Sequence, residues 1–253
     1  MLNGLYLSAM GAKVQDARAD VAAHNLANVN TPAFQRDQAV FRLRLAASEE
    51  RPELASCGEP RYEKVGGGVF LARIASLDEP GPLEETGQPL DVAIEGEGFL
   101  KVLSRDGASF FTRAGNLRRD DEGFLVTADG RYRVQGEGGG DLELPAGSVD
   151  INASGEIFSR GALVGKIGVV LPADPGRLRK QGDNLWTADG LVEEVPAPGR
   201  LLQGFREGSS VESVREMTEM IQAQRAYELN LRALRTQDET LGRAVNDVGR
   251  LTV

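Results

Sequence analysis

The sequence predicts an α+β protein in which long N- and C-terminal helices form a paired, coiled-coil-like domain and an antiparallel all-β domain is inserted between them. Both ends of the 253-residue chain carry apolar residues at helical spacing and lack proline. The middle alternates apolar and polar residues between turn signals. Glycine occurs 31 times and aromatic residues make up only 6%, which is typical of a β region with many tight turns.

Residues 1–32 are predicted to be an N-terminal assembly helix with two offset apolar stripes. Asn28 and Pro32 end it, because asparagine tolerates the left-handed conformation and proline cannot continue the helix. One stripe consists of Leu7, Met10, Val14, Ala17 and Val21. The other runs through Leu2, Leu5, Ala9, Ala12, Ala19, Ala23 and Leu26. A helix that is apolar on more than one face needs more than one neighbour, so the pattern favours self-association.

Residues 206–253 are predicted to be a C-terminal assembly helix. Its apolar positions alternate in steps of three and four, which is a heptad pattern with Asn230 and Gln237 as polar interruptions. The heptad residues are Met220, Ala223, Tyr227, Asn230, Leu234, Gln237, Leu241, Ala244, Val248 and Leu251. A second short stripe contains Val214, Met217 and Ile221.

Between the helices, residues 33–88 are expected to be an extended linker with short strands, including Val69–Ile74. Residues 89–205 are expected to form the antiparallel β domain. Its predicted strands lie around residues 90–94, 99–103, 108–112, 124–127 and 131–135, separated by glycine-containing turns.

Composition excludes several classes of protein. A net charge of −9 disfavours nucleic-acid binding. With one cysteine, Cys57, and one histidine, His24, neither an internal disulfide nor most metal sites can form. No apolar run is long enough to span a bilayer, and no cleavable signal peptide is evident. We therefore expect no metal, no cofactor, no nucleic-acid partner and no membrane insertion.

No motif selects a catalytic site. Gly96-Glu97-Gly98 precedes a strand and not a helix, so a turn or close backbone approach is favoured over a phosphate loop. Asp120-Asp121-Glu122-Gly123 lacks the full set of ligands of a calcium loop. We predict no catalytic residues. The alternatives are a β-domain enzyme such as a cell-wall hydrolase, whose carboxylate pair the sequence does not identify, and a hook- or adhesin-like fibre subunit.

Four segments, in order along the chain, resemble the flagellar rod and hook protein family. They are Asn25–Phe34 (NLANVNTPAF), Leu90–Phe99 (LDVAIEGEGF), Phe111–Asn116 (FTRAGN) and Met220–Glu228 (MIQAQRAYE). Ala33 stands where the family pattern has glycine, and His24 where it has a first asparagine. The length is similar to that of rod proteins and shorter than that of the hook protein. The C-terminal segment resembles that of the distal rod protein, which is favoured, whereas residues 5–12 and 88–94 resemble the proximal rod relative, which stays open as the alternative.

The resemblance implies a structural subunit of the bacterial flagellar basal-body rod, polymerising through its terminal helices into a tubular, torque-transmitting axle. It implies as partners other copies of the chain, other rod and hook subunits, the flagellar type III export apparatus and surrounding ring proteins. It implies location in the periplasm-spanning rod after export without a cleaved signal peptide. The expected assembly residues are Leu7, Met10, Val14, Val21, Asn25, Leu26, Asn28, Phe34, Met220, Ala223, Tyr227, Asn230, Leu234, Leu241 and Val248.

Overall fold

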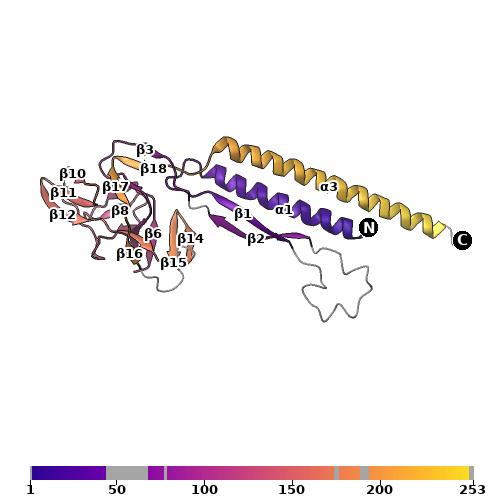
Figure 1. Ribbon diagram of the computed structural model, residues 1–253, viewed down its shortest axis with the longest axis horizontal. Coiled ribbons are helices and arrows are strands. Elements are labelled where there is room, and N and C mark those ends of the chain that lie inside the picture. Colours follow the sequence, from indigo (N-terminus) through magenta and orange to yellow (C-terminus); the bar gives the residue numbers. More distant parts are fainter. Residues whose placement is uncertain (1, 44–67, 77–78, 174–176, 189–193, 251–253) are drawn as a thin grey trace. The chain divides into compact units, whose positions relative to one another are not determined.

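A computed structural model of the chain describes residues 2–43, 68–76, 79–173, 177–188 and 194–250 (Figure 1). The chain divides into two compact units. Unit 1 comprises Met1–Val29, Arg36–Asp78 and Val211–Val253, and unit 2 comprises Asn30–Gln35 and Glu79–Ser210. No helix in the described ranges is long and apolar enough to cross a membrane.

Unit 1 contains two long helices and a β-hairpin. Helix α1 (Leu2–Ala27) and helix α3 (Ser213–Arg250) lie side by side (Figure 1). They are antiparallel, because the start of α1 lies beside the later part of α3 and Asn25, near the end of α1, bonds Glu216 in the first turn of α3. Helix α3 has 38 residues against 26 in α1, so it continues beyond the first residue of α1.

Strands β1 (Asp37–Leu43) and β2 (Val69–Ser76) pair in antiparallel register and contact α1. A bulge interrupts the register, since Val40 opposes Arg73 whereas Phe41 opposes Leu71. Phe41 and Val69 line a groove together with Val14.

The predicted coiled-coil-like domain is wrong. In the described ranges the chain has only two helices, and most of it is antiparallel sheet. A coiled coil needs apolar knobs from both helices, but α1 presents Gly4 and Gly11 to α3. The apolar stripe of α1 that contains Val14 and Val21 turns instead toward the hairpin. The heptad pattern in α3 therefore marks its covered face without producing knobs-into-holes packing.

In the described residues of unit 2, the strands pair only in antiparallel fashion. Its nine-stranded sheet has the order β14-β15-β6-β5-β9-β8-β7, with β13 pairing both β5 and β16. Three smaller sheets have the orders β10-β11-β12, β17-β4 and β18-β3. The strands are β3 (Leu83–Glu85), β4 (Val92–Glu95), β5 (Phe99–Ser104), β6 (Ser109–Thr112), β7 (Leu117–Arg119), β8 (Leu125–Thr127), β9 (Tyr132–Val134), β10 (Val149–Ile151), β11 (Glu156–Ser159), β12 (Ala162–Lys166), β13 (Val169–Pro172), β14 (Leu178–Gly182), β15 (Leu185–Ala188), β16 (Glu194–Pro196), β17 (Arg200–Gln203) and β18 (Phe205–Glu207).

One hydrophobic core joins the strands of unit 2. Leu100, Leu125 and Ile157, from three different strands, are fully buried. Alternate strand residues point to the same face, so the predicted strands near residues 90–94 and 99–103 place their apolar residues in this core.

A buried arginine in unit 2 holds the Gly96-Glu97-Gly98 turn. The Arg113 guanidinium donates to the carbonyl oxygens of Gly98 at 2.9 Å and Gly96 at 3.1 Å. Its Nε donates to Glu207 at 2.8 Å, and both side chains are almost fully buried. A Cβ at Gly98 would lie 2.6 Å from the Ala197 side chain. The segment is thus the predicted close backbone approach.

Candidate functional site

The predicted assembly residues of α3 lie along one face, and this face is turned toward α1. Ala223 is buried, and the remaining described members are half-buried, whereas the opposite side of the helix is exposed. The half-buried members are Met220, Tyr227, Asn230, Leu234 and Leu241. The side chain of Val248 lies outside the described residues.

The predicted residues of α1 do not share one environment. Val14 and Val21 line a groove of about 360 Å³ between α1, the hairpin and the start of α3. Met10 lies next to Gly68, just before β2. Leu7 is 49% exposed, and Leu26 is half-buried. The predicted assembly residues of α1 are therefore divided between the contact with the hairpin and the molecular surface.

Asn25 is the centre of a buried polar network in unit 1. Its Nδ2 donates to the Asp37 carbonyl oxygen at 2.9 Å and to Glu216 Oε2 at 3.1 Å, and its Oδ1 accepts from the Asp37 amide at 2.9 Å. Arg36 forms an ion pair with Glu216 and donates to both oxygens of Glu219 at 3.1 Å. The network joins the end of α1, the start of β1 and the first turn of α3. Sequence reasoning missed Arg36 and Glu216.

Asn28 and His24 extend this region at the helix end. Asn28 Nδ2 donates to the His24 carbonyl oxygen at 2.9 Å, which satisfies an end carbonyl of α1. The His24 ring lies 3.4 Å from the Asp37 carboxylate and is largely exposed. Both residues therefore shape the exit from α1. In the described part of the chain, no cluster of three or more His, Cys, Asp or Glu could hold a metal, and Cys57 lies outside that part.

Phe34 belongs to unit 2 and not to the helical unit. Its side chain is buried, and Lys180 Nζ lies 4.4 Å from its ring centroid. Lys180 also donates to the Gln35 carbonyl oxygen at 2.5 Å. The Phe34 carbonyl oxygen accepts from the Ser210 amide at 3.0 Å. The structure thus separates Phe34 from the other predicted assembly residues and attaches the segment Asn30–Gln35 to the β unit.

Ala33 occupies a backbone position suited to glycine. Its φ is 54°, in the left-handed region, and it is 5% exposed. Its amide donates to the Glu207 carbonyl oxygen at 2.9 Å, which holds the residue in this conformation. A Cβ in the left-handed region costs about 1–2 kcal/mol. Glycine, which has no Cβ, would adopt this conformation without that cost.

Replacing Ala33 with Gly is expected to stabilise unit 2 by about 0.5–1 kcal/mol, because relief of backbone strain outweighs the entropy that glycine adds to the unfolded chain. Fluorescence of Trp186, the only tryptophan, during urea unfolding measures this. Ala146→Gly, at an exposed loop residue without positive φ, is the control and should lose stability. Equal losses in both variants would contradict the strain at Ala33.

The structure reveals exposed apolar residues of unit 1 that were not among the predicted assembly residues. The outer ridge of α3 carries Val214, Met217 and Ile221, of which Val214 is 76% exposed. The hairpin exposes Leu43, Leu71 and Ile74. The α3 stripe is visible as a pattern in the sequence. The hairpin residues are not, because the bulge breaks their alternation and the two strands are far apart in the chain.

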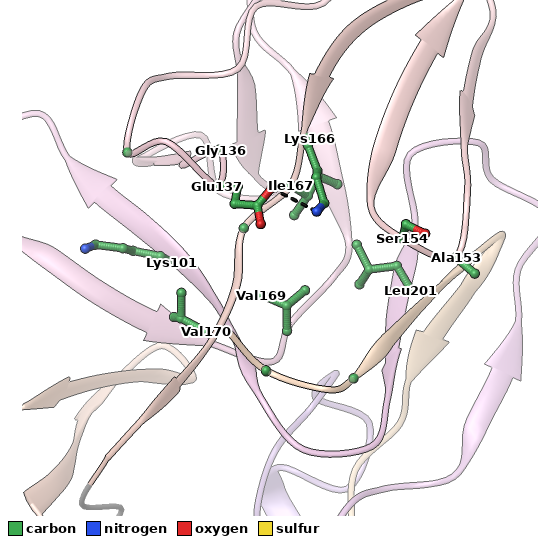
Figure 2. Close-up of a pocket in the computed structure, with 14 residues that line it drawn as sticks. Lys101, Gly136, Glu137, Ala153, Ser154, Lys166, Ile167, Val169, Val170 and Leu201 are labelled. Atoms are coloured by element: carbon green, nitrogen blue, oxygen red, sulfur yellow. Dashed lines mark ion pairs between the residues drawn. The ribbon is translucent and has the colours of Figure 1, made fainter. Parts of the chain in front are cut away.

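A cavity of about 290 Å³ lies in unit 2, between the ends of several strands (Figure 2). Its wall is mainly glycine and aliphatic residues. Its polar residues are Lys101, Glu137, Ser154 and Lys166, and Lys166 pairs with Glu137 at 2.8 Å. The wall offers one carboxylate, which is already paired, and not the two that a glycosidase uses.

The resolved pKa shifts have local structural causes on the surface of unit 2. The pKa of Asp141 lies below its usual value, mainly because Gln135 donates a hydrogen bond to its carboxylate. Burial acts in the opposite direction, and the hydrogen bond from Arg133 lowers the pKa further. Hydrogen bonds to Asp141 raise the pKa of Arg133. Neither residue lines the cavity.

Comparison with known proteins identifies the family. A family model described as the flagellar hook protein FlgE/F/G D1 domain matches residues 93–159, and one described as the flagellar basal body rod FlgEFG protein C-terminal matches residues 202–247. The chain is 34% identical to the flagellar basal-body rod protein FlgG of Caulobacter vibrioides, over 95% of this chain and 97% of the relative. It is 33% identical to FlgG of Bacillus subtilis, over 97% of this chain and 99% of the relative. It is also 33% identical to the flagellar basal-body rod protein FlgF of Caulobacter vibrioides, over 99% of this chain and 100% of the relative. The chain therefore belongs to the family of flagellar basal-body rod proteins.

Proposed function

We propose that this chain is a structural subunit of the bacterial flagellar basal-body rod and that its copies assemble through the exposed apolar surface of unit 1. The family is one of structural proteins and not of enzymes, and its members assemble with other rod and hook subunits in the basal body. The cell-wall hydrolase alternative is therefore set aside.

The distribution of exposed large hydrophobic residues supports unit 1 as the assembly surface. In the described ranges, unit 1 holds eleven of the fourteen, and unit 2 holds only Leu83, Leu163 and Val195. Contiguous apolar patches on a soluble protein mark interaction sites. The eleven are Tyr6, Leu7, Leu43, Phe70, Leu71, Ile74, Val214, Met217, Ile221, Leu229 and Val245.

These residues lie on different elements of unit 1, so one copy presents several different surfaces to its neighbours. The ridge lies on α3, whereas the other exposed apolar residues lie on the hairpin and on the start of α1, where Tyr6 lies beside Gly68. Contacts between unlike patches generate an open helical array when the rotation does not close. Such an array is the tubular axle, with many parallel contacts that resist torsion. In this proposal the buried heptad face of α3 supports the ridge, and the ridge makes the contact.

The proposal extends to location and partners. We place the chain in the periplasm-spanning rod, reached through the flagellar type III export apparatus without removal of a signal peptide. Surrounding ring proteins are the expected lateral partners. Mass spectrometry of the chain recovered from purified basal bodies tests whether a signal peptide is removed. We expect an intact Met1–Leu2 terminus, and a trimmed terminus would contradict export without cleavage.

The assembly surface is tested by placing a charge on the ridge. The double substitution Met217→Glu/Ile221→Glu is expected to abolish rod assembly while leaving the fold intact, because both side chains are more than 45% exposed and make the proposed contact. Electron micrographs of basal bodies and motility in soft agar, in a strain lacking the native copy, give the readout. Circular dichroism of the purified monomer verifies the fold.

Leu163→Glu is the matched control, because Leu163 is 61% exposed but lies in unit 2. We expect this variant to assemble rods. Normal rods from the ridge variant would rule out the ridge as the contact. Loss of assembly in both variants would show that the contact is not confined to unit 1.

A further inference from the structure

A seam of glycine and polar residues lies between the two helices of unit 1. On α1 the seam contains Gly4, Gly11 and Asn25, and on α3 it contains Gln237, Asn230 and Glu216. A Cβ on Gly11 would lie 2.7 Å from Asn230 Oδ1, and one on Gly4 would lie 3.1 Å from the Gln237 amide. Asn25 donates to Glu216 at 3.1 Å. We call this set the glycine–polar seam.

The spacing of the seam is the same on both helices. Gly4 and Gly11 are seven residues apart, as are Asn230 and Gln237, and Asn25 and Glu216 are each fourteen residues from the middle pair. In an antiparallel alignment these three pairs are therefore in a single register. A shift by one residue would place a side chain other than glycine against Asn230 or Gln237.

We propose that the glycine–polar seam determines the register of α1 against α3. The Asn230 and Gln237 side chains of α3 each occupy the space beside a glycine of α1. The hydrogen bond from Asn25 to Glu216 fixes the third pair of the seam. A shift by one residue would place Met10 or Ala12, in place of Gly11, against the Asn230 side chain, which leaves this polar group less room and an apolar neighbour. This inference concerns a single chain and stands whether or not copies assemble.

The cost of the glycines supports a role in specificity. A glycine inside a helix is about 1 kcal/mol less favourable than alanine. Gln237 Oε1 is also buried without a hydrogen-bond partner in the described structure, which is a further cost. Asn230 is held by its own bond from Nδ2 to the Ala226 carbonyl oxygen at 2.8 Å, so it cannot easily move away from Gly11.

The register has a consequence for the length of helix left beyond α1. With Gly4 opposite Gln237, the residues of α3 from about Thr240 onward lie past the first residue of α1. Eleven residues at about 1.5 Å each give roughly 16 Å of helix beyond the first residue of α1. Val245 lies on this part and is 71% exposed. A shift by one heptad would change this length by about 10 Å.

Alanine at three helical glycines tests the close fit. Gly242→Ala, on α3 with open space around it, is expected to raise the folding equilibrium constant of unit 1 about fivefold through helix propensity alone. Gly11→Ala gains the same propensity, but its methyl group meets Asn230. The folding equilibrium constant of this variant should therefore be roughly tenfold or more below that of Gly242→Ala. The methyl group in Gly4→Ala meets only the flexible end of Gln237, so the folding equilibrium constant of this variant should lie between those of the other two. The ellipticity at 222 nm during urea unfolding measures all three.

A double variant isolates the pair. In an Asn230→Ala background, Gly11→Ala should lose its penalty and behave like Gly242→Ala, because the obstructing side chain is gone. Equal effects of Gly11→Ala and Gly242→Ala, or no change of the penalty in the Asn230→Ala background, would overturn the proposed fit.

A distance measurement tests the register itself. In full-length protein with Cys57→Ser, spin labels on the exposed residues Lys13 and Glu228 should give one narrow distance distribution. Asn230→Leu/Gln237→Leu keeps the volume but removes polar specificity, so it should retain helix content and give a broadened or multiple distribution. A single narrow distribution identical to the native one would show that the seam does not set the register.

Discussion

Replacing Arg113 with Ala is expected to destabilise unit 2 by about 3–5 kcal/mol, the range for breaking a buried ion pair. The substitution leaves the Glu207 carboxylate buried without its cation, and Glu207 is only 1% exposed. It also removes the donor that satisfies the carbonyl oxygens of Gly96 and Gly98. Total stabilities of domains are about 5–15 kcal/mol, so a loss of this size brings unit 2 close to unfolding.

Trp186 fluorescence during urea unfolding reports on unit 2 and measures this loss. Arg131→Ala is the control, because Arg131 also forms two ion pairs but is 58% exposed. Exposed pairs contribute about 0–1 kcal/mol, so the control should change little. Similar small losses in the two variants would show that the Arg113–Glu207 pair is not essential to the fold.

The same pair shows why one of the motifs could be recognised but not explained from sequence. The Gly96-Glu97-Gly98 turn was predicted as a close backbone approach, and the structure confirms it. The guanidinium that holds this turn belongs to Arg113, which lies on a different segment. The balancing carboxylate belongs to Glu207, 94 residues farther along the chain. Periodicity shows which residues share a face but not which distant residues meet.

The strands show the same division. Those near residues 99–103 and 108–112 were predicted correctly because each has several alternating residues between clear turns. The strands after residue 136 are short, with three to five residues each, and were not individually predicted; β10 and β17 have three and four. Their pairing is long-range: β17 pairs β4, more than one hundred residues earlier. Such pairing depends on the tertiary fold, and no local signal encodes it.

For the candidate site, the sequence indicated which ends of the chain are apolar, but not how the surfaces are used. The heptad positions of α3 suggested the contact surface, yet they face α1 in the same chain. Two helices of one chain cover each other's faces wherever their patterns match, so a stripe alone does not distinguish an internal contact from an external one. The exposed ridge of α3 becomes visible only after the covered face is known.

Replacing Arg36 with Ala is expected to destabilise unit 1 by about 3–5 kcal/mol, because the fully buried Glu216 carboxylate loses its cation. The variant also removes the direct bonds from Arg36, just before β1, to Glu216 and Glu219 of α3. In the described ranges both helices belong to unit 1, so the ellipticity at 222 nm during urea unfolding follows this unit.

Arg215→Ala is a closely matched control. Arg215 contacts Glu219 at 3.3 Å, the same residue that Arg36 contacts, but its side chain is 57% exposed and the structure gives it no contact to Glu216. It should cost less than about 1 kcal/mol. The double variant Arg36→Ala/Glu216→Gln should recover part of the loss, because a neutral amide leaves no buried charge and can still accept from Asn25. If the double variant is no more stable than Arg36→Ala alone, the loss does not arise from the unpaired charge. The network around Asn25 would then act through packing instead.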